Sequence, residues 1–465
     1  MRVAILLIVT VLLAKAPAAT GQTRPGAAAP SQKLALVGGM LIDGYEVPPL
    51  HHAAVLIEGN RITWVGRAAD AQIPPDARVI DTTGRVMMPG LWEMHAHLDL
   101  IGHGDYARWF PWLRENKLTE QVMRISAKQF IDAGITSAVD LGSPVEESVR
   151  IRQQTEKNEV VGPRLWVSGP MMRLGRELLP GLGVINTPED AARTAEALAR
   201  AGVDIIKMQE GGFRVEHYRA VVAVARKHGK QTQAHVYFPE AVKAALDAGI
   251  DILQHVGSGG TPPYPPELMK EIVDRGIPVC PTAAHRVAVY PATIDFPERL
   301  QDPQLREDFG PQIYAEVQDS FKQWERLPYF QPLIGLGDTS RQAFFAERGS
   351  IAQWINSGAV VVMGTDSGTP MNFNTEALWR EIKLFVDYGM SPIKAISAAT
   401  RIAARAMGRG RDLGTVEPGK LADIIVIQGN PLFDIQSLAN VEVVIKDGHV
   451  LKGSAQVQAA GTRRE

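Results

Sequence analysis

The sequence contains a single cysteine, Cys280, and no large excess of charge of either sign. One cysteine excludes an intramolecular disulfide, so the core and any bound metal must supply the stability. Because Cys280 lies in an apolar run with no base near it in sequence, we interpret it as a small buried residue. The formal net charge of −2 gives no support for a nucleic-acid partner, and we expect a small-molecule substrate instead.

The sequence also lacks a hydrophobic run of the roughly 20 residues that a bilayer-spanning helix needs. A short apolar run follows Arg2 and ends in small residues, which predicts a secretory signal peptide over residues 1–21. Residues 22–32 are rich in proline, alanine, glycine and serine, and we predict a linker there. A lipoprotein signal is less favoured because no cysteine is available to carry the lipid, and an uncleaved anchor is less favoured still. We expect a secreted, periplasmic protein with no stable membrane insertion after cleavage.

Two strand-rich segments flank a long middle region. Residues 33–88 hold short apolar or alternating runs separated by turn residues, and the same pattern returns over residues 409–455. We predict one small β-sandwich-like domain that is built from both chain ends.

The middle region, residues 89–408, alternates short apolar runs with helical stretches. This repetition is typical of an α/β protein of the (β/α)8 TIM barrel type. A doubly wound sheet is the competing fold, but no glycine-rich phosphate loop follows a first strand. The repeat is interrupted at about 291–346, which is too long for an ordinary loop. This insertion is either a lid that faces the substrate or a structural elaboration.

An apolar run over residues 90–98 carries His95-Ala96-His97 near its end. Residues i and i+2 of a strand point to the same face, so the two imidazoles lie side by side. Such a pair is half of a metal site, although two ordinary surface or core histidines would look the same.

Four later predicted strands end in further candidate ligands, which are Lys207, His235, His255 and Asp366. Each has an ordinary explanation when taken alone, such as a core histidine, a solvated lysine or a helix N-cap. In a barrel, however, the C-terminal ends of the strands converge on one site. The occurrence of all six residues at strand ends therefore favours a metal centre.

With these residues in place, the sequence resembles the amidohydrolase superfamily over nearly the whole chain after the signal peptide. The closest branch is the imidazolonepropionase- and prolidase-like one. The motifs that carry the resemblance are His95-Ala96-His97, residues 134–140, residues 364–368 and residues 413–423.

The resemblance implies a binuclear centre. His95, His97 and Asp366 would hold one divalent ion, and His235 and His255 would hold the other. Lys207 would react with CO2, and its carbamate would bridge both ions. Zn²⁺ is the default ion for such a ligand set, and Co²⁺ or Mn²⁺ would also suit it.

The implied activity is hydrolysis of a carbon–nitrogen bond in a small peptide, an N-acyl amino acid or a related amide. The metals would activate water, and Asp366 would act as the catalytic proton carrier. Lactone, ester and carbamate hydrolysis are variants of the same chemistry. A mononuclear deaminase or a non-catalytic scaffold could share the fold, but the presence of Lys207 with a full ligand set argues against both. The oligomeric state is left open, with a homo-oligomer as one alternative.

The chain departs from the branch at two places. Tyr237 stands where the branch often has a second histidine, and residues 168–175 lack the histidine of a common "GGHGD" motif. A dipeptidase is therefore not assigned. Three residues are candidate substrate contacts, and each also has a purely structural explanation. Arg173 would bind a carboxylate or be a solvated loop residue. Tyr237 would donate to the oxyanion or be a packed aromatic residue, and His103 would line the pocket or lie in a loop.

Overall fold

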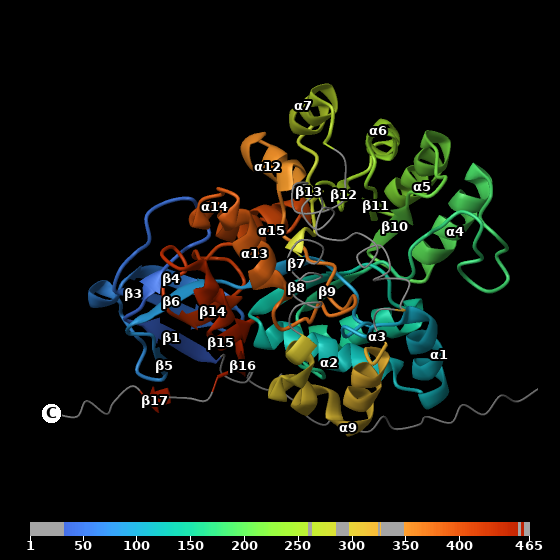
Figure 1. The fold of residues 1–465 in the computed structure, drawn as a ribbon. Helices are drawn as coiled ribbons and strands as arrows, with labels where there is room; N and C mark the ends of the chain where they lie inside the picture. The colour runs from blue at the N-terminus through green and yellow to red at the C-terminus, as the bar shows by residue number, and fades with distance from the viewer. Residues whose placement is uncertain are drawn as a thin grey trace, which may run out of the picture. The chain divides into compact units, whose positions relative to one another are not determined.

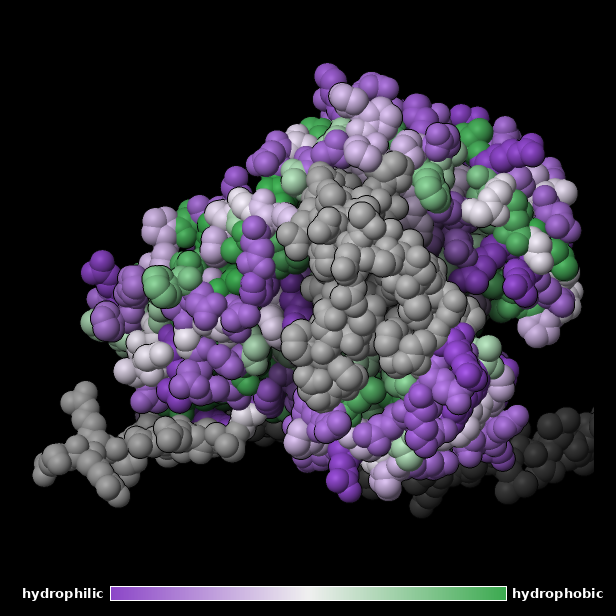
Figure 2. Space-filling view, in the orientation of Figure 1, coloured by the Kyte–Doolittle hydropathy of each residue, from purple (hydrophilic) through white to green (hydrophobic). Residues whose placement is uncertain are grey.

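The computed structural model describes residues 32–258, 263–284, 297–323, 326, 348–453 and 457–459. The chain divides into two units after Ser31, and the description concerns the second unit. The predicted signal peptide and nearly all of the predicted linker lie outside the described residues. No helix in the described part is long and apolar enough to cross a membrane. On the face shown in Figure 2, hydrophilic residues cover most of the described surface, and the hydrophobic areas are small and separate.

Two five-stranded sheets combine strands from both flanks of the chain (Figure 1). The first has the order β17-β5-β1-β3-β4, and the second has the order β16-β15-β14-β6-β2. The early strands are β1 (Lys33–Val37), β2 (Met40–Leu41), β3 (Ala53–Glu58), β4 (Arg61–Arg67), β5 (Arg78–Asp81) and β6 (Arg85–Pro89). The late strands are β14 (Ile424–Gln428), β15 (Val441–Lys446), β16 (His449–Lys452) and β17 (Val457–Ala459).

One hydrophobic cluster joins these two sheets. It takes Leu36 from the first sheet and Met87, Ile424 and Ile445 from the second. The β-branched sequence of β14 suits a buried central strand, and β14 pairs antiparallel with both β6 and β15. Burial of this shared apolar face explains why the two ends of the chain come together.

Parallel strands and helices alternate through the middle region. The strands are β7 (Leu91–Ala96), β8 (Ile135–Asp140), β9 (Arg164–Val167), β10 (Ile205–Gln209), β11 (Gln231–His235), β12 (Ile252–Gln254) and β13 (Val279–Cys280). The helices between them are α1 (Tyr106–Asn116), α2 (Thr119–Asp132), α3 (Val145–Glu156), α4 (Pro188–Arg200), α5 (Val215–Lys227), α6 (Pro239–Ala248) and α7 (Pro266–Asp274). Hydrogen-bonded ladders run in the orders β7-β8-β9 and β10-β11-β12-β13. The α/β class is therefore as predicted.

The last predicted strand of the middle region, residues 360–364, is not a continuous strand. Val361 forms an isolated parallel bridge to Val279 of β13, and Ser367 forms one to Ala96 of β7. Asp366 has a φ of 57°, a left-handed conformation that interrupts an extended ladder. Gly364 packs so closely on β7 that an added Cβ would lie 2.8 Å from the backbone nitrogen of His95. The segment thus connects β13 to β7 without a regular ladder.

The described part of the expected insertion packs as a structural layer. It contains α9 (Pro303–Ser320), which bends at Gly310, where φ is 68°. Phe309 and Ile313 of α9 share a hydrophobic cluster with Trp109 and Leu113 of α1. Residues 285–296 and 327–347 of this region lie outside the described residues.

Short elements complete the fold. They are α12 (Arg348–Asn356), α13 (Ala377–Asp387), α14 (Pro392–Ser397), a π-helical turn (Ala398–Ile402), α15 (Ala403–Ala406) and 3-10 turns at Ala68–Asp70, Pro297–Gln301 and Ile435–Ala439.

Candidate metal centre

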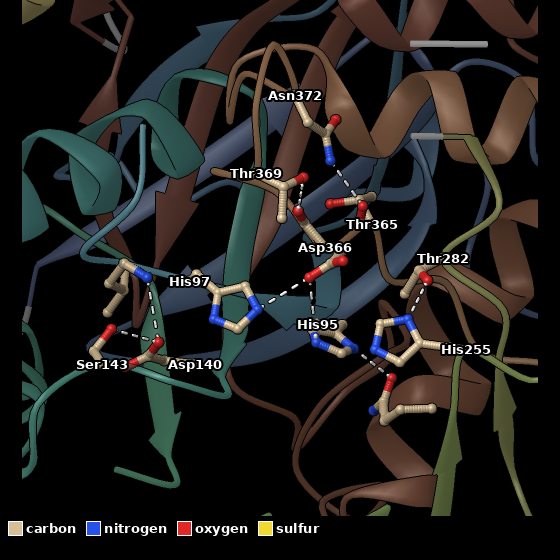
Figure 3. Close-up of polar contacts among 12 residues, drawn as sticks. His95, His97, Asp140, Ser143, His255, Thr282, Thr365, Asp366, Thr369 and Asn372 are labelled. Atoms are coloured by element: carbon tan, nitrogen blue, oxygen red, sulfur yellow. Dashed lines mark hydrogen bonds and ion pairs between the residues drawn. The ribbon is translucent and has the colours of Figure 1, made fainter. Parts of the chain in front are cut away.

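Three of the predicted ligands meet at the C-terminal end of β7. One ligand atom from each of His95, His97 and Asp366 lies within 4.8 Å of the other two. Asp366 Oδ1 lies 3.0 Å from His97 Nε2 and 3.5 Å from His95 Nε2 (Figure 3). Two imidazole nitrogens and a carboxylate oxygen at this spacing can hold a divalent metal ion.

The other two histidines extend this group. The His255 ring lies 4.5 Å from the His95 ring and 4.2 Å from the His235 ring, measured between centroids. His255 follows β12 with a φ of 68°, and its Nδ1 lies 2.7 Å from Thr282 Oγ1 (Figure 3). Its Nε2 is buried and has no hydrogen-bond partner among the described residues. A buried nitrogen in this state is suited to a metal bond.

Lys207 lies on β10 and is fully buried. Its Nζ has no hydrogen-bond partner in the part of the chain that the structure describes. Burial lowers the pKa of Lys207 to about 7, and Asp366 opposes this shift. Lys446 is also buried, but its Nζ donates to the carbonyls of Thr155 and Gly162. An unpaired buried amine costs free energy of folding, so packing alone does not explain why a lysine occupies position 207.

A polar layer behind the ligands holds them in place. Gln254 Oε1 lies 2.8 Å from His95 Nδ1. Glu93 accepts hydrogen bonds from the backbone N–H groups of His95 and Thr365 and from the Thr365 hydroxyl. Burial raises the pKa of Glu93 to about 8, although these three donors act in the opposite direction. The contacts tie the end of β7 to the segment that carries Asp366.

A second polar group supports the turn after His97. Asp140 Oδ1 accepts from the backbone N–H of Leu98 and from the Ser143 hydroxyl. Burial, and then the neighbouring Asp140, raise the pKa of Asp99 to about 7. Asp99 was not predicted as a site residue from the sequence, although it continues the i+2 spacing of His95 and His97.

A cavity of about 620 Å³ opens beside these ligands. Its wall includes the ligands His95, His97, His235 and Asp366. Arg173 and Tyr237, two of the three predicted substrate contacts, also line it. The Tyr237 ring centroid lies 4.9 Å from that of His235 and 5.1 Å from that of His255.

His103, the third predicted substrate contact, is not among the residues that line this cavity. It is fully buried, its Nε2 lies 3.2 Å from Glu316 Oε1 of α9, and its ring stacks on Trp109. This position favours the structural explanation of His103 over a contact with substrate. The reason is a long-range contact with the insertion, which has no signal near His103 in the sequence.

The chain is similar to a known protein family and to several known proteins. The model of the amidohydrolase family matches residues 86–451. The ochratoxinase of Aspergillus niger is 26% identical over 475 aligned residues, which cover 92% of this chain and 87% of that protein. The imidazolonepropionase of Streptomyces griseus subsp. griseus is 23% identical and covers 81% of this chain and 86% of its own length.

Solved structures show the same fold. A Xaa-Pro dipeptidase with bound methionine matches with a TM-score of 0.70 and 24% identity, covering 91% of this chain and all of that one. Molinate hydrolase matches with a TM-score of 0.71 and 20% identity, covering 90% of this chain and 95% of its own. The family match spans most of the sequence and includes all six predicted ligands. The chain therefore belongs to the amidohydrolase family of hydrolases.

Proposed function

We propose that the protein is a binuclear metal-dependent amidohydrolase that cleaves the C–N bond of a small peptide, an N-acyl amino acid or a related amide. The observation that carries this proposal is the fully buried amine of Lys207, which has no hydrogen-bond partner among the described residues and lies near the histidine and aspartate cluster. Membership of the amidohydrolase family supports amide hydrolysis.

The side chains fit two divalent ions. His95, His97 and Asp366 would hold one ion, and His235 and His255 would hold the other. The neutral imidazoles and the carboxylate suit Zn²⁺, and Co²⁺ or Mn²⁺ are also compatible with them. Bound cations of this kind acidify water and polarise a carbonyl oxygen. The buried Nε2 of His255, which has no hydrogen-bond partner in the described ranges, supports the second position.

A carbamate on Lys207 would complete the centre. The neutral amine forms a bond from Nζ to the carbon of CO2, and one proton leaves to solvent. A potential ammonium then becomes an anion with two oxygen ligands. This change would give the buried Lys207 side chain the partners that it lacks among the described residues.

Two side chains at the cavity wall have roles in the reaction. Asp366 would take a proton from the attacking water and deliver it to the leaving nitrogen. Tyr237 would donate a hydrogen bond to the oxygen on which negative charge develops. Its place at the wall against His235 and His255 supports this role.

We infer that β7 to β13 and residues 360–367 close into a (β/α)8 barrel over residues 89–408. The bridges from Val361 to Val279, from Ser367 to Ala96 and from Met172 to Met208 support this closure. We infer in addition that residues 33–88 and 409–455 form one small β domain, which the cluster between the two end sheets supports.

We also propose that residues 1–21 are a cleaved signal peptide and that the protein acts in the periplasm. Cell fractionation and mass measurement of the mature chain test this proposal. Retention of residues 1–21 in a cytoplasmic protein would contradict it.

Metal analysis with a substrate panel tests the activity. We expect about two equivalents of metal per chain and hydrolysis of an N-acyl amino acid or a dipeptide, which a chelator abolishes and Zn²⁺ restores. If the enzyme turned over only lactones, esters or carbamates, its activity would be hydrolysis of that bond and not of an amide. Fewer than about one equivalent of metal together with no hydrolysis would overturn the proposal.

A further inference from the structure

Two guanidinium groups line the cavity on the side of the loop that follows β9. They belong to Arg173 and Arg176, and both residues are exposed. Neither side chain has a hydrogen bond or an ion pair with a carboxylate in the described ranges. Burial, and then the nearby positive charge of Arg176, lower the pKa of Arg173. The two cations therefore face a cavity in which an anion would relieve their repulsion.

The carboxylates of the same wall have other partners. Glu177 Oε1 accepts from the backbone N–H groups of Gly181 and Gly183 at 2.9 and 3.2 Å. Asp99 lies beside the Ser143 hydroxyl, and Asp366 belongs to the metal ligands. Within the described residues, these contacts leave no carboxylate of this wall paired with Arg173 or Arg176.

The loop that carries the arginines is hydrogen-bonded to β10, the strand that holds Lys207. The N–H of Met172 donates to the carbonyl of Lys207 at 2.9 Å, and the N–H of Gln209 donates to the carbonyl of Met172 at 2.9 Å. Farther along the loop, the N–H of Ile185 donates to the carbonyl of Arg176 at 3.1 Å. The backbone next to Arg173 is therefore tied to β10, and the backbone of Arg176 is tied to another part of the same loop.

The cavity also has an apolar side. Tyr106 and Phe110 of α1 line it, and their ring centroids are 6.1 Å apart. Leu100 and Leu178 add aliphatic surface to the same wall. A molecule that fills the cavity would thus contact the candidate metal-binding side chains, two positive charges and an apolar surface.

The geometry points to a substrate class: Arg173 and Arg176 bind the free carboxylate of an N-acyl amino acid, while Tyr106 and Phe110 contact an apolar part of the same molecule. This inference rests on the proposed amidohydrolase function. Guanidinium groups suit it because their planar donors match the two oxygens of a carboxylate. The scissile amide would lie between this subsite and the metal ligands.

A matched pair of substrates tests the charge requirement. N-benzoylphenylalanine and N-benzoylphenethylamine differ only in the carboxylate, and both are assayed with the metal-loaded enzyme. We expect kcat/KM to be about 10- to 100-fold higher for the first, the range of a hydrogen-bonded charged contact. Equal values for the two substrates would overturn the inference.

Variants assign the effect to these residues. Arg173→Gln and Arg176→Gln should each raise KM for N-benzoylphenylalanine about tenfold or more and leave kcat/KM for N-benzoylphenethylamine within about twofold. Arg173→Lys should recover part of the loss, since it keeps the charge. The control is Arg200→Gln, because Arg200 is exposed on α4, pairs with Glu196 and does not line the cavity. An equal loss for both substrates would contradict a carboxylate subsite.

Binding of an unreactive probe separates this inference from the proposed activity. N-benzenesulfonylphenylalanine and N-benzenesulfonylphenethylamine are titrated calorimetrically into the metal-loaded protein. Tighter binding of the acid, lost in Arg173→Gln, would support the subsite even if no amide were hydrolysed. Equal binding of acid and neutral compound would overturn the subsite even if the enzyme hydrolysed amides.

Discussion

Gln254 determines which nitrogen of His95 faces the cavity. The Nε2 of Gln254 donates to the carbonyl of Met94 at 3.2 Å and to Gln233 Oε1 at 2.7 Å. Its Oε1 is therefore the acceptor, so the His95 Nδ1, 2.8 Å away, carries the hydrogen. The Nε2 of His95 then presents its lone pair on the side of Asp366. A hydrogen bond of this kind orients a metal-ligating imidazole and raises its basicity.

Replacing Gln254 by leucine should weaken metal binding about 10- to 100-fold, because the His95 ring loses this orientation. Metal affinity is measured by competition with a chelator of known strength. The control is Gln129→Leu, which removes another buried amide that bonds Asp308. Both variants should lose stability, but only Gln254→Leu should lose metal affinity. Equal affinities in the two variants would contradict the role of Gln254.

Replacing Lys207 by methionine should reduce the metal content from about two equivalents to about one or fewer. The variant lacks the nitrogen that would carry the carbamate, so added bicarbonate should not restore activity. Lys446→Met is the matched control, because Lys446 is buried but bonds to backbone carbonyls away from the cavity. A full metal complement and full activity in Lys207→Met would refute the bridging carbamate.

Asp366→Asn should lower kcat about 10²- to 10⁴-fold, the usual range for loss of a general acid–base group, with a much smaller change in KM. Steady-state kinetics and metal content are measured together, since Asp366 is also a proposed ligand. Asp308→Asn serves as the control, because its side chain is 3% exposed and it lies outside the cavity lining. A kcat within tenfold of the parent would rule out proton transfer by Asp366.

Gly142→Ala should weaken metal binding without a large change in folding. An added Cβ would lie 2.5 Å from His97 Nδ1, so the imidazole must move. The φ of Gly142 is not positive, so alanine fits the backbone there. Metal titration and a thermal unfolding midpoint are compared with the parent protein. An unchanged metal affinity would show that His97 does not need its present position.

His103→Ala should lower the free energy of unfolding by about 1–3 kcal/mol, because the buried Glu316 loses a hydrogen-bond partner. Both kcat and KM should stay within about twofold, since His103 does not line the cavity. Denaturant unfolding and steady-state kinetics check these expectations. A tenfold rise in KM with unchanged stability would instead support His103 as a substrate contact.

Several elements of the fold were predictable because they depend on local patterns. The strands β1 and β5 have the bounds that alternation and turn residues predict. The segment 360–364 is apolar in the same way, yet it forms only isolated bridges. Its conformation depends on how Gly364 meets β7 and on the left-handed φ of Asp366. Neither feature has a periodic signal.

The sequence by itself determined the types of the candidate metal ligands and their order along the chain. Each candidate ligand lies at or near the end of a predicted strand, and strand ends can be predicted from local residue patterns. His95, Lys207 and Asp366 can be identified in this way without knowledge of the distances between them in the structure.

Only the tertiary structure decided how the surroundings act on these ligands. It left the Lys207 amine without a partner in the described part of the chain, placed Gln254 against His95 and placed Glu316 against His103. Gln254 and His95 are 159 residues apart, and His103 and Glu316 are 213 residues apart. Contacts over such separations depend on strand register and on the packing of whole helices. Local residue patterns do not encode them, so the residue types were predictable and their environment was not.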